Sequence, residues 1–254
     1  MLNLNNKQKV CFPEAVIFDT DNTLYSYEPA HKAATKSVVK KATNIFGISE
    51  NEFTQAFEGS RLEIKERLGD TASSHSRLLY FQRTIEYLGM GTRILTALDL
   101  EQTYWRTFLA NAKLFPGVEI FIKTLKQKGI KTANITDLTA QIQFRKMVYF
   151  GLDEYFDYVV TSEESSRDKP HIDSFKLALE KLNIPANKIW MIGDDFESDI
   201  VGAANVGMVT IQRKCKNTAV NTVSGKRPDI SFFNYNELLK IVKGPPVSGY
   251  LSAQ

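Results

Sequence analysis

The sequence predicts an α/β fold in which helices cover both faces of a parallel β-sheet. Short apolar segments recur along the chain, and segments with helical spacing of apolar side chains separate them. Strands that alternate with helices in this way are typical of parallel sheets, because each crossover helix packs on a face of the sheet. Residues 27–111 interrupt the alternation with a pattern that is helical throughout, which predicts an inserted α-helical domain.

Bulk composition indicates an ordinary globular protein. The chain has 254 residues, of which 43% are hydrophobic and 24% are charged, as in most folded domains. The length suits one large domain or a core with a smaller module. The net charge of +3 is too small to favour nucleic acid or an anionic membrane as a partner.

The sequence pattern also predicts a soluble, cytoplasmic protein. Residues 1–14 contain no apolar stretch, which argues against an ordinary signal peptide. No run approaches the ~18 apolar residues of a membrane span. Cys11 and Cys215 have neither metal-site nor disulfide spacing, and sparse cysteine is typical of a reducing compartment. A monomer and a homodimer are both consistent with the sequence.

Six apolar segments are predicted as strands. The first contains no polar residue, and the fourth contains the run Ile-Trp-Met-Ile. Such runs are typical of strands buried on both faces of a parallel sheet. With their intervening helices they predict a Rossmann-like, doubly wound core. The predicted strands are residues 15–18, 130–136, 158–161, 188–192, 208–211 and 229–232.

Helices are predicted between these strands. Pro116 suits a helix start, Phe121 and Leu125 share an apolar side, and Gly129 can close the helix. Two further helices are predicted over residues 139–150 and 172–182. Residues 244–254 are rich in glycine and proline and favour no regular element.

The helical insertion carries its own start signals. Ser49 and Glu52 have the spacing of a capping box, and Asp99 with Gln102 resembles a second cap. Aromatic residues at helical spacing are expected to form the core of this module. Because the module begins almost directly after the first strand, it can cover the strand ends. The predicted division is a core of residues 1–26 and 112–254 and a helical cap domain of residues 27–111.

Two carboxylates follow the first predicted strand. Residues 18–25 read Phe-Asp-Thr-Asp-Asn-Thr-Leu-Tyr, which places Asp19 and Asp21 at the carboxyl end of that strand. Paired carboxylates repel each other unless a cation lies between them, and Mg²⁺ is typically held by carboxylate and phosphate oxygens. Taken alone, the segment is equally consistent with an Asp-rich turn.

Two later segments add polar groups near predicted strand ends. Thr136 ends the second strand shortly before a helix, where a hydroxyl and free N–H groups suit phosphate oxygens. An ordinary helix cap by Thr136 or Asp137 explains the same pattern. Lys169 precedes a proline before the helix at 172–182, and by itself it reads as a solvated lysine.

An acidic segment follows the strand predicted at 188–192. Asp194, Asp195 and Asp199 cluster directly after this buried strand, where several carboxylates are costly without a cation. Gly193 allows the backbone to approach closely. The alternative interpretation is an acidic loop with a helix cap.

In their order along the chain, these segments resemble the haloacid dehalogenase superfamily of hydrolases, and specifically its phosphatases. The stretch from Asp19 to Thr23 matches the first motif, Asp-x-Asp-x-Thr. Thr136 resembles the Thr or Ser of the second motif, and Lys169 resembles the Lys of the third. Asp194 after a glycine, with the later Asp199, resembles the fourth. The helical insertion matches the position of the first type of cap domain.

The resemblance implies a Mg²⁺-dependent phosphatase that acts on a small phosphorylated metabolite through an aspartyl-phosphate. Asp19 is then the nucleophile, and Asp21 is the general acid and later the base. Mg²⁺ is implied at Asp19, Asp194 and the backbone carbonyl of Asp21. Lys169 and Thr136 are expected to bind the remaining phosphate oxygens.

Supporting positions and departures follow from the same resemblance. Asp199 is expected to orient the loop or Lys169, whereas a supporting role and an exposed position are both open for Asp195. Asn22 replaces the usual glycine of the first motif, and His171 stands where many members have Asp. Neither change removes a charged or nucleophilic group of the motifs.

Substrate specificity is expected to come from the cap. His75 and Arg77 belong to a polar turn that can reach over the active site, although their sequence pattern favours a solvated loop and helix start. The segment Asp-Asn-Thr-Leu-Tyr resembles nucleotide monophosphatases of the superfamily, which makes a nucleoside monophosphate one candidate substrate.

Three alternative functions remain at this point. A phosphomutase shares the same core and differs in the group that receives the phosphoryl group. A 2-haloacid dehalogenase-like hydrolase is disfavoured by Asp21, because dehalogenases need no leaving-group acid. A non-catalytic binding protein on this fold usually lacks the nucleophile or the acid, and both are present.

Overall fold

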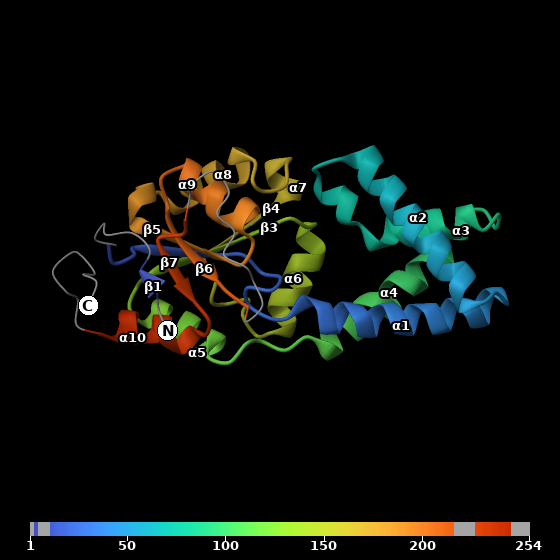
Figure 1. The fold of residues 1–254 in the computed structure, drawn as a ribbon, viewed down its shortest axis with the longest axis horizontal. Coiled ribbons are helices and arrows are strands. Elements are labelled where there is room, and N and C mark those ends of the chain that lie inside the picture. The colour runs from blue at the N-terminus through green and yellow to red at the C-terminus, as the bar shows by residue number, and fades with distance from the viewer. Residues whose placement is uncertain (1–2, 5–10, 216–226, 245–254) are drawn as a thin grey trace.

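The computed structural model describes residues 3–4, 11–215 and 227–244 (Figure 1). They form a seven-stranded sheet with the order β1-β7-β6-β5-β2-β3-β4, in which β1 alone is antiparallel to its neighbour. The predicted α/β class is therefore confirmed. The strands are β1 (Asn3–Leu4), β2 (Ala15–Phe18), β3 (Lys131–Thr136), β4 (Tyr158–Thr161), β5 (Ile189–Gly193), β6 (Val209–Arg213) and β7 (Ile230–Phe232).

Strand β2 lies in the interior of the sheet, between β5 and β3, and is apolar on both faces. Alternate side chains of β2 join two separate cores, Val16 and Phe18 on one side and Ala15 and Ile17 on the other. All four are fully buried. This burial on both faces is what the uninterrupted apolar run predicted.

Helices cover both faces of the sheet, as predicted. In Figure 1, α8 and α9 lie on one side of the sheet and α5 and α10 on the other. Phe121 of α5 and Tyr235 of α10 pack in the core that holds Phe18, whereas Phe175 of α8 packs in the core that holds Ile17. The helices around the sheet are α5 (Val118–Gln127), α6 (Ala140–Tyr149), α7 (Ser162–Ser165), α8 (Ile172–Leu182), α9 (Gly202–Asn205) and α10 (Tyr235–Lys243), with short turns η2 (Ala186–Lys188) and η3 (Phe196–Val201).

Residues 27–111 fold as a helical module beyond one end of the sheet (Figure 1). Small and branched residues of its first helix, such as Ala34 and Val38, share a core with Tyr104 and Phe108 of its last helix. The module contains α1 (Tyr27–Phe46), α2 (Glu50–Leu68), η1 (Ala72–His75), α3 (Arg77–Tyr87) and α4 (Ile94–Asn111).

The chain enters and leaves the module at neighbouring points. Tyr25 and Leu114 form an antiparallel bridge, and the Phe115 N–H donates to the Leu24 carbonyl oxygen at 2.8 Å. Both crossings lie close to the end of β2. The module is therefore attached beside the strand that carries Asp19.

Of the two predicted helix caps in the module, one is confirmed and one is wrong. Ser49 caps α2 by accepting from the Glu52 N–H, as predicted, but Asp99 is not a cap. Helix α4 already begins at Ile94, and Asp99 lies inside it, where its carboxylate pairs with Lys41 at 2.5 Å.

Strand β1 was not predicted from the sequence, because two residues are too few to show an alternating or apolar pattern. Of the irregular tail predicted from residue 244, residues 245–254 lie outside the described part. Across the described ranges, no helix combines the length and apolar character needed to cross a membrane.

Candidate active site

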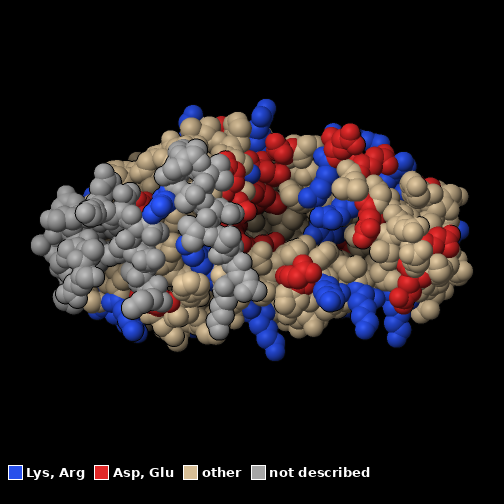
Figure 2. Space-filling view, viewed as in Figure 1, with Lys and Arg blue, Asp and Glu red and all other residues tan. Residues whose placement is uncertain are grey.

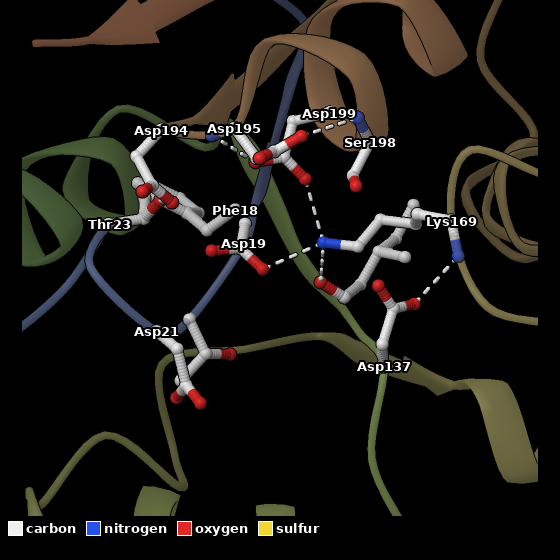
Figure 3. Close-up of polar contacts among 12 residues, drawn as sticks. Phe18, Asp19, Asp21, Thr23, Asp137, Lys169, Asp194, Asp195, Ser198 and Asp199 are labelled. Atoms are coloured by element: carbon white, nitrogen blue, oxygen red, sulfur yellow. Dashed lines mark hydrogen bonds and ion pairs between the residues drawn. The ribbon is translucent and has the colours of Figure 1, made fainter. Parts of the chain in front are cut away.

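The carboxyl ends of three adjacent strands bring the predicted polar residues together (Figure 3). Asp19 follows β2, Thr136 ends β3, and Asp194 follows β5. Phe18 lies level with both Asn134 and Ile192 in the register of the parallel pairs, so the chains beyond these strands begin at one edge of the sheet. Lys169 reaches the same place from the loop before α8.

Lys169 connects two carboxylates at the centre of the site. Its Nζ donates to Asp19 Oδ1 and to Asp199 Oδ1, both at 2.7 Å, and lies 3.4 Å from the Ile135 carbonyl oxygen. Burial alone would lower the pKa of Lys169, but the charges of Asp19 and Asp199 raise it well above its ordinary value. Lys169 is therefore a buried ammonium, and the interpretation as a solvated lysine is wrong.

Asp19, Asp194 and Asp199 form a cluster whose carboxylate oxygens lie within 4.8 Å of one another. Burial, and then the charge of Asp19, raise the pKa of Asp194 to about 7, although Thr23 donates a hydrogen bond to it at 3.3 Å. Lys169 alone therefore does not balance the negative charge of the cluster. A set of close carboxylate oxygens with excess negative charge fits a hard divalent cation.

The loop after β5 depends on a close contact between Gly193 and Asp199. A Cβ atom at Gly193 would lie 2.2 Å from Asp199 Oδ2. The same Oδ2 accepts from the Asp195 N–H at 3.1 Å. The Asp195 side chain is exposed and accepts from the Ser198 N–H at 2.7 Å, so it caps the turn η3. The helix-cap interpretation of the acidic segment thus holds for Asp195.

Asp21 faces the cavity beside a lysine that the sequence analysis missed. Its carboxylate accepts from Lys146 Nζ at 2.6 Å and from the Tyr25 hydroxyl. Burial opposes ionisation of Asp21, but the charge and hydrogen bond of Lys146, with the hydrogen bond of Tyr25, outweigh it and lower the pKa.

Of the pair Lys146 and Asp21, the lysine is the more deeply buried. Its side chain is 1% exposed, against 38% for Asp21, and its Nζ lies 5.6 to 5.8 Å from the ring centroids of Tyr25, Trp105 and Phe108. One sequence signal could have identified it. Lys146 follows Ile142 by four residues, on the side of α6 that its apolar residues mark as buried.

Thr136 and Asp137 do not cap the following helix. Thr139 is the residue at the N-cap position of α6. Asp137 instead accepts from the Lys169 N–H at 2.8 Å, and burial raises its pKa to about 6 against the opposing charge of Lys169. Thr136 is buried and lines the cavity.

A cavity of about 280 Å³ lies between the sheet edge and the helical module. Figure 2 shows acidic side chains facing basic side chains across a hollow. The core contributes an acidic wall with one lysine, and the module contributes aromatic and basic side chains. The lining residues are Asp19, Asp21, Asn22, Tyr27, Arg61, Lys65, His75, Arg77, Tyr80, Trp105, Thr136, Asp137, Leu138 and Lys146.

His75 and Arg77 both line this cavity, rather than forming a solvated loop. His75 Nε2 lies 2.9 Å from Asp168 Oδ2, which joins the module to the core next to Lys169. Arg77 donates to the His75 carbonyl oxygen at 2.8 Å and to the Tyr27 hydroxyl at 2.6 Å. A second contact between the two parts is the Asp168 N–H, which donates to the Asp70 carbonyl oxygen at 3.1 Å.

The fold and the site define an α/β enzyme with a cavity of carboxylates and lysines at its strand ends. The family model of the haloacid dehalogenase-like hydrolases matches residues 13–207. The chain belongs to this family, as the motifs predicted, and it is a hydrolase.

Relatives and solved structures agree with this assignment. The chain is 37% identical over 198 residues to the ribulose-1,5-bisphosphate 5-phosphatase of Halopiger xanaduensis, covering 78% of this chain and 83% of that protein. It is 29% identical over 234 residues to the glyceraldehyde 3-phosphate phosphatase of Methanocaldococcus jannaschii, covering 91% and 97%. The crystal structure of an HAD phosphatase from Thermococcus onnurineus superposes with a TM-score of 0.72 at 26% identity, covering 92% of this chain and 99% of that one.

Proposed function

We propose that this protein is a Mg²⁺-dependent phosphatase that hydrolyses a small phosphorylated sugar or related metabolite. The observation that carries the proposal is the ion pair of Lys169 and Asp19, with Asp194 beside it and Asp21 in the same cavity. This set contains a nucleophile, a cation for phosphate oxygens, a metal-binding carboxylate and a proton donor. The substrates in the names of the relatives, ribulose 1,5-bisphosphate and glyceraldehyde 3-phosphate, support the sugar phosphate class.

The residues at the sheet edge fit a bound Mg²⁺. Asp199 is already engaged by Lys169 and by the Asp195 N–H, so the proposed ligands are the Asp19 and Asp194 carboxylates with the Asp21 backbone carbonyl. When bound, Mg²⁺ neutralises phosphate charge and allows an anionic nucleophile to approach.

The side chains of the site then divide the reaction between them. A carboxylate oxygen of Asp19 attacks phosphorus, the bond to the leaving oxygen breaks, and Asp21 gives that oxygen its proton. Asp21 next takes a proton from the water that cleaves the aspartyl-phosphate, which releases inorganic phosphate and restores Asp19. Lys169 and Thr136 hold the remaining phosphate oxygens.

The pairing of Asp21 with Lys146 has a role in this scheme. In the free protein, Lys146 favours ionised Asp21, whereas a general acid must carry a proton. A phosphate group in the cavity brings negative charge near Asp21 and offsets the attraction of Lys146. Substrate binding therefore favours the protonated form that the first step needs.

The helical module, residues 27–111, is proposed to act as the cap that closes over the substrate. It supplies one wall of the cavity and contacts the core at Asp168. Because it carries Tyr27 and Trp105 on that wall, a nucleoside monophosphate whose base lies against these rings is the second candidate substrate. Phosphomutase, haloacid dehalogenase and binding functions are the remaining alternatives.

The test is phosphate release from a panel of phosphate esters, with Mg²⁺ and with a chelator. The panel contains p-nitrophenyl phosphate, glyceraldehyde 3-phosphate, ribulose 1,5-bisphosphate and nucleoside monophosphates. We expect Mg²⁺-dependent turnover that Asp19→Asn lowers by about a thousandfold or more. Asp195→Asn is the matched control, because it removes an exposed carboxylate nearby and keeps its capping oxygen.

Each alternative predicts a different result from the same panel. Full turnover by Asp19→Asn would falsify the aspartyl-phosphate mechanism. An isomerised phosphate ester without free phosphate would indicate a mutase, and halide release from 2-haloacids would indicate a dehalogenase. Folded protein that binds phosphate esters without turning over any of them would indicate a binding protein.

A further inference from the structure

Three cationic side chains of the helical module line the cavity. Arg61 and Lys65 lie one turn apart on α2, and Arg77 begins α3. None of the three takes part in an ion pair among the residues that the structure describes. Their charge toward the cavity is therefore available to a ligand.

The acidic residue between Arg61 and Lys65 pairs with other cations. Glu63, between Arg61 and Lys65 on α2, accepts from Arg83 Nε at 2.7 Å and pairs with Arg67. Among the described residues, Glu63 thus pairs with Arg67 and Arg83 and with neither Arg61 nor Lys65, and Lys65 feels only the more distant charge of Asp168. This arrangement costs stability, because like charges four residues apart on a helix repel each other.

The surroundings of Arg77 point to the same conclusion. Its guanidinium is partly buried, with the rings of Tyr80, Tyr104 and Trp105 at 5.2 to 5.8 Å. Its hydrogen bonds go to a carbonyl and a hydroxyl oxygen, which carry no full charge. Buried charges in proteins are usually paired, so an anion is the missing partner. Burial, and then the charges of Arg61 and Arg77, lower the pKa of Lys65, as expected for crowded cations.

The two core lysines of the site, Lys169 and Lys146, are already paired with carboxylates. Lys169 pairs with Asp19 and Asp199, and Lys146 pairs with Asp21. A phosphate ester seated at Asp19 uses Lys169 and the metal ion of the proposed function. Arg61, Lys65 and Arg77 remain on the opposite wall of the same cavity, where the far end of a short substrate arrives.

We propose that Arg61, Lys65 and Arg77 form a second anion subsite, which binds the far phosphate of a bisphosphorylated substrate while the near phosphate is hydrolysed at Asp19. The proposal rests on the phosphatase function above and narrows its substrate class. Three cations match the charge of about −2 on a phosphate monoester better than the single charge of a carboxylate. An Arg guanidinium can also donate two parallel hydrogen bonds to two oxygens of the same phosphate group.

The test compares α,ω-alkanediol bisphosphates of three to six carbons with the alkyl monophosphates of the same length. We expect kcat/KM for the best bisphosphate to exceed that of its monophosphate by at least about tenfold. Arg61→Gln combined with Lys65→Gln should reduce this ratio by at least about tenfold, mainly through KM. Arg67→Gln is the matched control, since Arg67 lies on the same helix and pairs with Glu63, and it should leave the ratio unchanged.

A binding measurement separates this proposal from the phosphatase function. Calorimetry with the Asp19→Asn protein should show tighter binding of the bisphosphate than of the monophosphate, and the double substitution should remove the difference. Turnover with equal kcat/KM for both esters would overturn the second subsite and leave the phosphatase. Preferential binding of the bisphosphate without turnover in the native protein would overturn the phosphatase and leave the subsite.

Discussion

At the scale of single residues, Lys169 determines the charge state of the site. One ammonium neutralises part of the charge of Asp19 and Asp199, while burial, and then the charge of Asp19, raise the pKa of Asp194. Both the backbone and the side chain of Lys169 are held by hydrogen bonds. Its backbone N–H donates to Asp137, and its Nζ donates to the carboxylates of Asp19 and Asp199. Small changes around this residue are therefore expected to alter both stability and chemistry.

Removing the partner of Asp21 should change its titration. In Lys146→Met the attraction that lowers the pKa of Asp21 is lost, while the burial that raises it remains. We expect the pKa of Asp21 to rise, measured by carboxyl ¹³C NMR and assigned with Asp21→Asn. Lys123→Met, which removes a lysine paired with Glu119 far from the cavity, is the control. An unchanged Asp21 titration would contradict the role assigned to Lys146.

Replacing Asp137 should stabilise the metal-free protein near neutral pH. The pKa of Asp137 is raised to about 6 by burial, so between about pH 4 and 6 the folded state holds a proton that the unfolded state releases. The free energy of unfolding therefore falls as pH rises through this window. Asp137→Asn removes that fall and keeps an acceptor for the Lys169 N–H, with a gain at pH 7 of about 1–3 kcal/mol.

Urea unfolding of both proteins from pH 4 to 8 measures this difference. Asp157→Asn controls for the loss of one charge, because Asp157 also accepts a backbone N–H, from Thr132. A variant that is less stable than the native protein at pH 7 would show that the carboxylate, rather than its oxygen alone, is needed at Lys169.

At the scale of elements, the end of β5 and the turn η3 form one unit. Gly193→Ala places a Cβ against Asp199, which must then move away from Lys169. We expect a stability loss of about 1–3 kcal/mol together with a fall in kcat, measured by urea unfolding and phosphate release. Gly59→Ala is the control, since its Cβ meets nothing within 4 Å, and a stability gain of about 1 kcal/mol is expected in this exposed helix. Equal effects of the two substitutions would contradict the contact.

The elements of the core could be predicted because their signals are local. An apolar run such as that of β2 indicates a strand buried on both faces without knowledge of its neighbours. The start of α4 could not be predicted from the sequence. Asp99 is a residue type that often caps helices, but here it lies inside the helix and pairs with Lys41, which is 58 residues away. The pairing of Lys146 with Asp21 could not be predicted for the same reason, since the two residues are 125 positions apart, although the apolar side of α6 indicated that Lys146 is buried.

At the scale of the whole molecule, the contact between His75 and Asp168 joins the module to the core. His75→Ala should loosen this contact, raise KM and increase amide hydrogen exchange in residues 69–77. His171→Ala is the matched control, because His171 pairs at 3.0 Å with Asp173 of its own helix. Unchanged exchange in residues 69–77 would mean that the other contacts, such as that of Asp70 with Asp168, suffice to hold the module.

The clustering of Asp19, Lys169 and Asp194 could be predicted, because parallel strands bring their carboxyl ends to one edge of the sheet. The second wall of the cavity could not be predicted in the same way. Arg61 and Lys65 are ordinary helix-surface residues in the sequence, and only the packing of α2 above the sheet edge turns them toward Asp19. His75 and Arg77 were identified because a polar turn interrupts the helices at their position.

The bridge between Tyr25 and Leu114 gives the molecule a modular architecture. Since the chain leaves the core and returns to it at adjacent points, a different insert can replace residues 27–111 without moving β2 or the loops after β3 and β5. If residues 27–111 act as the proposed cap, exchange of this one segment between related genes would alter which compounds are accepted and leave the residues at the strand ends in place. The two parts of the chain can then diversify independently.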